Sequence, residues 1–393
     1  MRQRPTRTTA IRAVSVLALA TLTGSAAAGC SSSGSSGGTS PSSSANSSSS
    51  SSANIAAATK IINSALAVPS AITQTVPLTA KPSRGLIIFL NNGEPDTEVI
   101  GNGTREAAQA VGWSYTSISY DASSPASLQQ AFLNALAEHP TVVTEAGNPQ
   151  GEFGASVISQ YAAAGVPIIP TSTSPVTQGA AIPVTGANIP NGYSTNKAMA
   201  EVLAAWFVKD SDGHGKALIP NITAYPTLQG VVDGFEQETK ALCPDCTVST
   251  IPISLSEVAG GTVVSTAVTA VQRTGANYLI FDNGEFGTGA ETALKTAGLS
   301  NVIVSGISPQ PSQIAGMKNG VHEAWMNQGF QYVGWATLDL AFRLLEKLPL
   351  TTNDATQPVQ LITTANAKSV SEQVNIPIPS TGLGTFMKLW KVG

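Results

Sequence analysis

Charged side chains are scarce in this chain, in which Asp, Glu, Lys and Arg together make up 11% of 393 residues and the formal net charge is -4. Proteins that bind nucleic acid or an anionic membrane surface electrostatically gather Lys and Arg into a basic patch. The sequence has no such excess of basic residues, so it predicts no nucleic-acid partner and no other large polyanionic partner.

Histidine and cysteine are also rare, with three residues of each type. His139, His214 and His322 leave little material for a metal site or a His-dependent catalytic centre. No G-x-S-x-G motif stands between a predicted strand and a predicted helix, as the elbow of hydrolases requires, and the G-x-G segments at 101–103 and 287–289 do not form a full dinucleotide-binding fingerprint. We therefore expect no metal, no cofactor and no enzyme activity.

The apolar runs at residues 13–23 and 85–90 are too short to span a membrane. The first run follows four arginines within the first twelve residues and precedes a segment of small residues. This order is typical of a secretory signal peptide, which is removed from the mature protein.

The signal segment ends in Ala27-Ala28-Gly29-Cys30, which resembles a bacterial lipobox. The resemblance implies a lipoprotein signal peptide over 1–29, cleavage before Cys30, and lipidation of Cys30. Several acyl chains would anchor the protein stably to the outer face of the cytoplasmic membrane. Ala27 stands where such motifs usually have Leu, so ordinary secretion is the alternative.

Residues 30–52 are almost entirely Ser and Gly. This composition buries too little apolar surface to offset the entropy lost on ordering, so it predicts a flexible tether. Residues 53–83 form an N-terminal lead-in, in which we expect a short helix over 53–67 and then an extended, proline-containing segment.

Residues 84–113 carry the pattern around which the rest of the chain is organised. The continuous apolar run 85–90 lacks the alternation of a half-exposed strand, so it predicts a parallel strand that is buried on both faces. A crossover helix should then cover about 96–111 and end before Gly112. The polar loop at 91–95 leaves the carboxyl end of the strand, where open parallel sheets bind their ligands.

The same alternation of apolar runs and helical patterns continues to about residue 348. Strands are expected at 113–119, 141–145, 166–171, 182–185, 217–220, 247–253, 278–281 and 302–305. Helices are expected at 127–138, 154–164, 193–209, 227–242, 262–274, 287–297 and 331–348. Such alternation gives βαβ units, and its two nearly equal halves predict an α/β fold with two doubly wound parallel-sheet lobes.

Short segments in matching register carry a family resemblance over about 84–350. They are LNN at 90–92, DGF at 233–235, FDN at 281–283, TAG at 296–298 and VSG at 304–306. In this register the chain resembles the type I periplasmic solute-binding proteins of ABC importers, of the ribose/galactose type.

This resemblance implies a hinge of three strands between the lobes, with crossings near Gly186, Asn327 and Pro358. The N-terminal lobe would consist of 84–186 plus 328–357, and the C-terminal lobe of 187–327 plus 358–393. The tail after Thr363 has no counterpart in the family pattern.

Loops at the carboxyl ends of the strands in both lobes should line the crevice and enclose a ligand when the lobes close. The predicted ligand-binding residues are Asn91, Asn92, Glu94, Asn148, Phe153, Thr173, Asn188, Tyr225, Gln229, Asn283, Phe286, Ser308 and Gln328. Four more polar residues follow the same strand ends, namely Ser172, Asn221, Glu285 and Gln310.

The predicted lining contains no Lys or Arg. An anionic ligand would need such a cation, whereas amides and aromatic faces suit a hydroxyl-rich molecule. Sugar-binding relatives often carry an Arg and an Asp where this chain has Gln229 and Ser308, and losing both argues against a pyranose held by charge-assisted hydrogen bonds. The sequence therefore predicts a small neutral polar solute of the sugar or polyol class.

Each of these residues also has a purely structural interpretation. Asn before Gly, as at Asn92 and Asn283, is common in turns that need unusual backbone angles. Phe153, Tyr225 and Phe286 would equally fit the core of a lobe.

Cys243 and Cys246 form a C-x-x-C motif. Outside the membrane, with Cys30 acylated, these two thiols have only each other, so a local disulfide is expected. A redox role like that of thioredoxin would place the motif at a helix start, whereas this motif follows a helix.

These features together predict an extracytoplasmic, lipid-anchored and monomeric substrate-binding protein. It would capture its solute by hinge closure and deliver it to the permease subunits of an ABC importer. The alternative is a sensory solute receptor of the same fold that signals to a membrane kinase.

Overall fold

The computed structural model describes residues 44–351, 356–371 and 379–392. Residues 45–393 form one compact unit. The signal segment, Cys30 and most of the predicted tether lie outside the described residues, so lipidation of Cys30 stays a prediction. Among the helices of the described ranges, none is long and apolar enough to cross a membrane.

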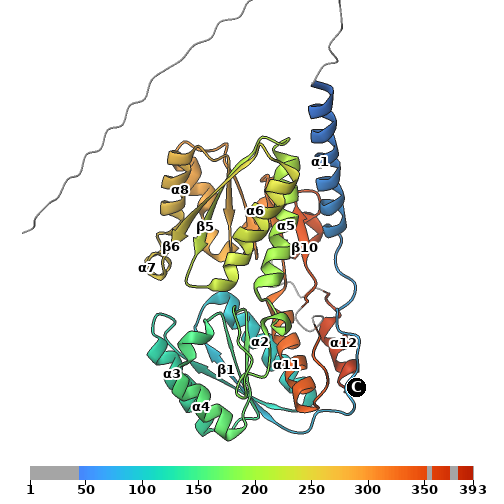
Figure 1. The fold of residues 1–393 in the computed structure, drawn as a ribbon, viewed down its shortest axis with the longest axis vertical. Helices are drawn as coiled ribbons and strands as arrows, with labels where there is room; N and C mark the ends of the chain where they lie inside the picture. The colour runs from blue at the N-terminus through green and yellow to red at the C-terminus, as the bar shows by residue number, and fades with distance from the viewer. Residues whose placement is uncertain (1–43, 352–355, 372–378, 393) are drawn as a thin grey trace, which may run out of the picture. The chain divides into compact units, whose positions relative to one another are not determined.

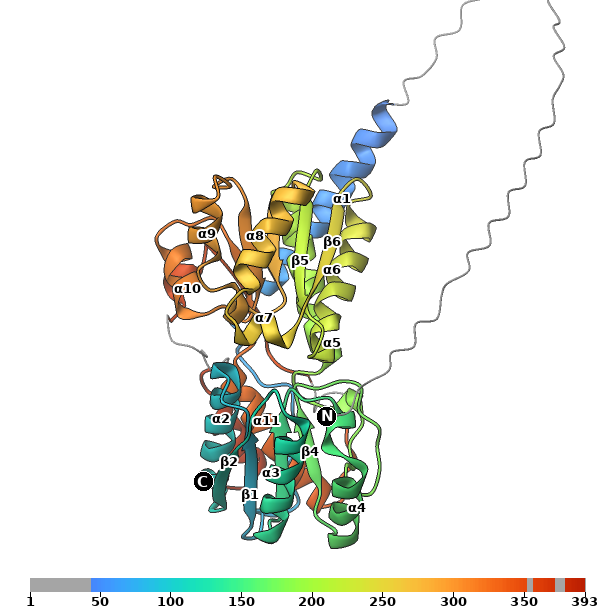
Figure 2. The ribbon, with the colours of Figure 1, turned by 90° about the vertical axis from the view of Figure 1, so that its left-hand side faces the viewer.

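The first lobe contains a four-stranded parallel sheet in the order β2-β1-β3-β4. Its strands are β1 (Leu86–Asn91), β2 (Ser114–Ser119), β3 (Val142–Ala146) and β4 (Ile168–Thr171). Its helices are α2 (Pro95–Val111), α3 (Pro125–Ala137), α4 (Ala155–Ala164) and α11 (Phe330–Leu345). Figure 2 shows α3 and α4 on one side of this sheet and α11 on the other.

The second lobe contains a six-stranded sheet in the order β10-β9-β8-β7-β5-β6, parallel except for β10. The strands are β5 (Lys216–Ile222), β6 (Thr247–Ile253), β7 (Tyr278–Phe281), β8 (Ile303–Ile307), β9 (Ala324–Asn327) and β10 (Gln360–Thr363). The helices are α5 (Tyr193–Asp210), α6 (Gln229–Leu242), α7 (Leu255–Ala259), α8 (Val263–Thr274), α9 (Ala290–Thr296) and α10 (Pro311–Lys318). The fold is therefore the predicted α/β architecture of two doubly wound lobes (Figure 1).

The strand at 86–91 is buried as its continuous apolar pattern predicts. Ile87, Ile88, Phe89 and Leu90 have no exposed surface, because β1 is central in its sheet and is covered on both faces. The following helix α2 ends at Gly112, which adopts a left-handed φ of 83° that favours glycine.

The chain passes between the lobes between β4 and α5, between β9 and α11, and between α11 and β10. One boundary of the predicted lobes differs from the structure. The tail at 358–393 was expected in the second lobe, but only β10 joins that sheet.

Helix α12 (Gly382–Leu389) belongs to the first lobe instead. Phe386 and Trp390 are fully buried in its core, where the Trp390 ring lies 5.3 Å from that of Phe342. The indole nitrogen of Trp390 donates a hydrogen bond of 2.8 Å to Asp339. Burial of two large aromatic side chains decides this placement, which local periodicity does not reveal.

The N-terminal helix is longer than expected. Helix α1 spans Ser44–Ala65, so it begins within the Ser-rich stretch assigned to the tether. Its residues Ala58 and Ile62 are buried against the core of the second lobe, whereas Leu78 of the lead-in lies in the core of the first. The lead-in thus contacts both lobes.

The strand expected at 182–185 is absent from the sheet of the first lobe. The segment runs beside β4 and makes a backbone hydrogen bond from Ile168 N to Ala181 O. Pro183 has no N–H to continue a ladder of hydrogen bonds, which accounts for the missing strand. Helices α7 and α10 were not predicted, since both are short.

Two glycines allow α2 and α11 to pack closely. A Cβ atom on Gly103 would lie 2.2 Å from the Gln331 carbonyl oxygen, and one on Gly334 would lie 2.3 Å from the Ile100 carbonyl oxygen. Backbone atoms of the two helices thus touch where any side chain would separate them.

We expect Gly334→Ala to lower the free energy of unfolding by about 1–3 kcal/mol, because the helices must move apart to admit the methyl group. Gly384→Ala in α12 is the matched control, since its Cβ would meet nothing within 4 Å. The control should be neutral or stabilising by up to about 1 kcal/mol. Thermal and urea unfolding measure both, and equal effects of the two variants would contradict this packing argument.

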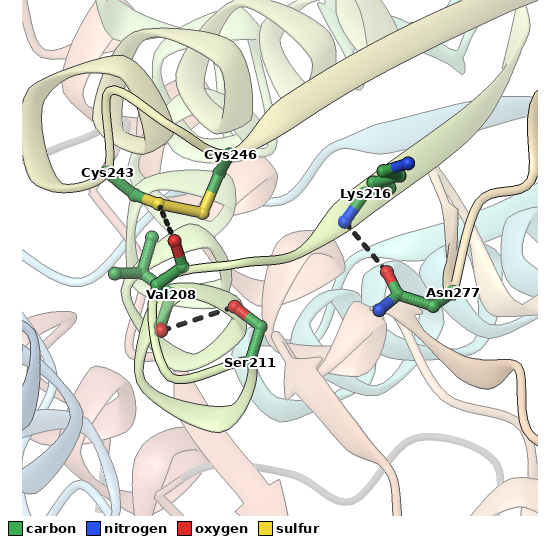
Figure 3. The surroundings of a disulfide bond; sticks show 7 residues. Val208, Ser211, Lys216, Cys243, Cys246 and Asn277 are labelled. Atoms are coloured by element: carbon green, nitrogen blue, oxygen red, sulfur yellow. Dashed lines mark hydrogen bonds between the residues drawn. A yellow bond between two sulfur atoms is a disulfide. The ribbon is translucent and has the colours of Figure 1, made fainter.

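Cys243 and Cys246 form a disulfide with a Cα–Cα distance of 5.3 Å. Figure 3 shows the disulfide, which lies between the end of α6 and the start of β6. The sulfur of Cys243 is 3.1 Å from the carbonyl oxygen of Gly213. Nearby, Lys216 at the start of β5 donates its backbone N–H to Asn277 over 2.7 Å (Figure 3).

The double variant Cys243→Ala/Cys246→Ala should lose about 2 kcal/mol of stability, the loop-closure entropy of so short a ring. Denaturant unfolding with and without a reductant measures this. The reductant should destabilise the wild type and leave the double variant unchanged. A wild type insensitive to full reduction would show that the bridge adds no stability.

Candidate functional site

A cavity lies between the carboxyl ends of the strands of the two lobes. Its volume is about 540 Å³, including the part that opens to solvent. The first lobe contributes eight lining residues, namely Glu94, Asp96, Thr97, Ile100, Ala146, Gly147, Ser172 and Phe330. The second lobe and its connections contribute eleven, namely Asn191, Asn196, Tyr225, Thr227, Leu228, Asn283, Glu285, Phe286, Ile307, Ser308 and Gln328. Most lie in the connections that lead from the carboxyl end of a strand to the next α-helix, so the topology of parallel strands brings them to one place.

Hydrogen bonds join the lobes across this cavity. The hydroxyl of Tyr225 donates to the carboxylate of Glu94. The side-chain nitrogen of Asn283 donates to Oδ2 of Asp96 over 2.8 Å, and that of Gln310 donates to Oδ1 over 3.4 Å. The structure therefore shows the lobes in contact, with two carboxylates from one lobe bonded by neutral groups of the other.

The two carboxylates stand at the start of α2. Glu94 is the N-cap residue, Pro95 occupies the first turn, and Asp96 follows it. Pro fits this position because its missing N–H would have no partner there, and the positive end of the helix dipole stabilises nearby carboxylates.

Three carboxyl groups in the cavity have raised pKa values. Burial raises the pKa of Asp96 to about 6, against hydrogen bonds from Asn283 and Gln310 that lower it. Burial, and then the charges of Asp96 and Glu94, raise the pKa of Glu285 to about 8. Burial also raises the pKa of Glu94. Removing these groups from water thus favours their protonated forms.

Six of the thirteen predicted ligand-binding residues line the cavity, namely Glu94, Tyr225, Asn283, Phe286, Ser308 and Gln328. Gln328 lies where β9 leads into α11 and donates to the Ser308 hydroxyl over 2.6 Å. Its side-chain oxygen accepts a hydrogen bond from Gln357. The side-chain amides of Gln328 and Gln357 thus connect the cavity wall to the third segment that passes between the lobes, the one between α11 and β10.

The other seven residues lie outside the cavity lining. Asn91 and Asn92 shape the loop after β1: Asn91 bonds Glu98 and the N–H of Gly93, and Asn92 accepts from the N–H of Glu94. Asn188 bonds Thr185 and the carbonyl of Thr351. These contacts match the turn interpretation of Asn at such positions.

Asn148, Thr173, Phe153 and Gln229 also point elsewhere. Asn148 is bonded to buried Glu145, and its carbonyl accepts from Thr173. Phe153 is fully buried against Phe132, with ring centroids 4.9 Å apart. Gln229 is exposed and bonds Asp233. These four side chains thus make hydrogen bonds or packing contacts within the protein, and none of them lines the cavity.

Several lining residues were missed by sequence reasoning. Asp96 and Thr97 were treated only as the start of a helix, although the N-terminus of a helix after a buried strand is a common ligand site. Asn191 follows the strand predicted at 182–185 but was not among the predicted ligand-binding residues, and Asn196 lies within α5 and so in no strand-end loop. Phe330 begins α11, so only the return of the chain to the first lobe brings it to the cavity.

Two amide oxygens of the cavity have no hydrogen-bond partner among the described residues, Asn191 Oδ1 and Asn196 Oδ1. Their amide nitrogens are engaged, by Ser172 Oγ at 2.9 Å and by Thr227 at 3.2 Å. Within the parts of the chain that are described, no cluster of His, Cys, Asp and Glu could hold a metal ion.

Comparison with known proteins places this fold and cavity in a family. The profile of the periplasmic binding protein domain matches residues 87–349, and the chain belongs to this family. A sequence search of curated proteins finds no match.

Solved structures of solute-binding proteins share the type I fold. An ABC transporter solute-binding protein from Burkholderia graminis in complex with D-arabinose superimposes with a TM-score of 0.59 at 16% identity, covering 75% of this chain and 99% of that one. One from Mycobacterium smegmatis with bound glycerol gives 0.62 at 15% identity, covering 75% and 99%. One from Agrobacterium vitis with bound allitol gives 0.59 at 14% identity, covering 73% and 97%.

The raised pKa values predict a pH-dependent stability. A carboxyl whose pKa is higher in the folded state than in the unfolded chain stabilises the fold at low pH, and this contribution is lost as the pH rises through the folded value. For Glu285 the window runs from 4.5 to about 8. Buried Glu145, with a pKa of about 8, and Asp282, with a pKa of about 7, act in the same direction.

We expect the melting temperature of the ligand-free protein to fall between about pH 5 and about pH 9, and to fall less in Glu285→Gln. Glu138→Gln, which removes an exposed carboxylate at the C-terminal end of α3 and outside the cavity lining, is the control and should follow the wild type. A pH profile unaltered by Glu285→Gln would contradict the assigned protonation.

Proposed function

We propose that this protein captures a small sugar or polyol between its two lobes and delivers it to the permease of an ABC importer. The observation that carries the proposal is the composition of the cavity wall, to which both lobes contribute. Since only the closed arrangement brings both sets of residues to one ligand, the ligand stabilises closure, and no bond is made or broken.

The chemistry of the wall supports this ligand class. Amides of Asn191, Asn196 and Gln328 and carboxylates of Glu94 and Asp96 can bond hydroxyl groups. Phe286 and Phe330 offer apolar faces for the C–H surfaces of a carbohydrate. The structural relatives hold D-arabinose, glycerol and allitol.

The proposal includes an extracytoplasmic location. The signal segment and the motif at Cys30 support export, cleavage and acylation, which would hold the protein at the outer face of the cytoplasmic membrane. Metabolic labelling with a fatty acid, compared between the wild type and Cys30→Ala, tests this part separately from ligand binding.

A thermal-shift screen of sugars and polyols tests the binding function. A ligand at 100 times its dissociation constant adds ~2.7 kcal/mol, a rise of several degrees in melting temperature. Stabilisation by amino acids or organic acids alone would contradict the proposed class.

Closure should depend on the hydrogen bond from Tyr225 to Glu94. Tyr225→Phe keeps the ring and removes one bond to a charged group, so the affinity for the best compound of the screen should fall about tenfold or more. Tyr193→Phe is the matched control, because it removes a tyrosine–carboxylate bond, to Asp233, that lies within the second lobe. Isothermal titration measures both variants, and equal affinities of the two would show that this contact is not coupled to binding.

A further inference from the structure

All the charged side chains in the described lining of the cavity are acidic. Its wall contains the carboxylates of Glu94, Asp96 and Glu285, and of the residues that line it in the described structure none is Lys, Arg or His. The absence of cations argues against an anionic ligand, but it does not argue against a cationic one.

The donors that face these carboxylates are already engaged. Tyr225 donates its hydroxyl to Glu94, and Asn283 donates its amide to Asp96. Glu285 accepts a hydrogen bond from the backbone N–H of Asp96 but none from a side chain of the lining residues that the structure describes, and the charges of Asp96 and Glu94, which raise its pKa, have the same sign. A ligand that enters this part of the cavity therefore meets three carboxyl groups, and the side-chain donors that face two of them are already engaged.

Two further acceptors lie in the wall and have no partner. Asn191 and Asn196 are 5% and 1% exposed, and the oxygen of each side chain lacks a hydrogen bond within the described residues. The carbonyl oxygen of Thr227, 3.2 Å from the Asn196 amide, requires the nitrogen on that side, so the oxygen is the unpaired atom. A buried acceptor without a partner destabilises the structure, and a donor group on the ligand would supply the missing hydrogen bond.

We propose that the solute is an amino-substituted sugar or polyol, whose protonated amino group lies between Glu94, Asp96 and Glu285 while its hydroxyl groups donate to Asn191 and Asn196. This inference rests on the proposed function and refines its ligand class. An ammonium only donates hydrogen bonds, whereas a hydroxyl in its place would both donate and accept. The faces of Phe286 and Phe330 in the same wall also attract a cation.

The raised pKa values agree with this assignment. Without a counter-charge, Glu285 keeps its proton to about pH 8. A bound ammonium would favour the ionised carboxylate, so binding near neutral pH should release a proton. A ligand without charge would release none.

The test is isothermal titration of the full mature protein with matched compounds. D-Glucosamine, D-glucose and N-acetyl-D-glucosamine form one set, their galacto isomers a second, and glucamine with sorbitol a third. We expect the best amine to bind at least about tenfold more tightly than its neutral counterparts. Titration in two buffers of different ionisation enthalpy should show proton release for that amine only.

The outcomes separate this inference from the proposed function. Neutral members binding as tightly as the amines, or more tightly, would overturn the inference and keep the sugar or polyol function. If ethanolamine bound as tightly as the amino sugars, the amino group of the proposed ligand would be supported, but its sugar or polyol part would be contradicted. No binding by any member would count against both.

Variants of Glu285 provide the second readout. Glu285→Gln should weaken amine binding about tenfold and change the affinity for the neutral counterpart less than about threefold, whereas Glu285→Asp should retain the preference for the amine. Glu138→Gln is the charge-matched control outside the cavity. Equal weakening of the amine and of the neutral compound by Glu285→Gln would indicate a structural role and contradict the inference.

Discussion

The contacts between the start of α2 and the opposite lobe determine the properties of the cavity. Glu94 and Asp96 must lose water when the lobes close, and Tyr225 and Asn283 replace part of it with hydrogen bonds. Desolvation nevertheless dominates, so the pKa of Asp96 rises to about 6 and that of neighbouring Glu285 to about 8.

Acidic residues are scarce in this chain, yet several of them line the cavity. In a protein with only 24 acidic residues, three acidic side chains line one cavity. Burying a charge is costly unless it is paired, and the lobes supply neutral donors for two of the three. The third carboxyl group, that of Glu285, accepts no side-chain hydrogen bond from the lining residues that the structure describes.

The architecture was largely predictable, because parallel strands buried on both faces leave a continuous apolar signature, as in residues 86–91. Helix ends were predictable where a glycine such as Gly112 must adopt a positive φ. The strand expected at 182–185 did not form, since Pro183 interrupts hydrogen bonding. Helix α12 joined the first lobe, since its aromatic residues complete a core assembled from distant segments.

The sequence by itself determined most of the strands and helices in their order, the two lobes, and which loops lie at the carboxyl ends of the strands. Those loops contain Glu94, Tyr225, Asn283 and Ser308. Chain topology alone places each loop at the edge of its sheet where the carboxyl ends of the parallel strands meet. Only the tertiary structure decided which side chains of each loop turn toward the cavity: Asn188 bonds the carbonyl of Thr351, far away in the sequence, and Phe153 fills the core against Phe132. It also brought in Asp96, Asn196 and Phe330 from helices. The physical reason is that the direction of a side chain depends on hydrogen bonds and packing with residues far away in the sequence, which local patterns do not encode.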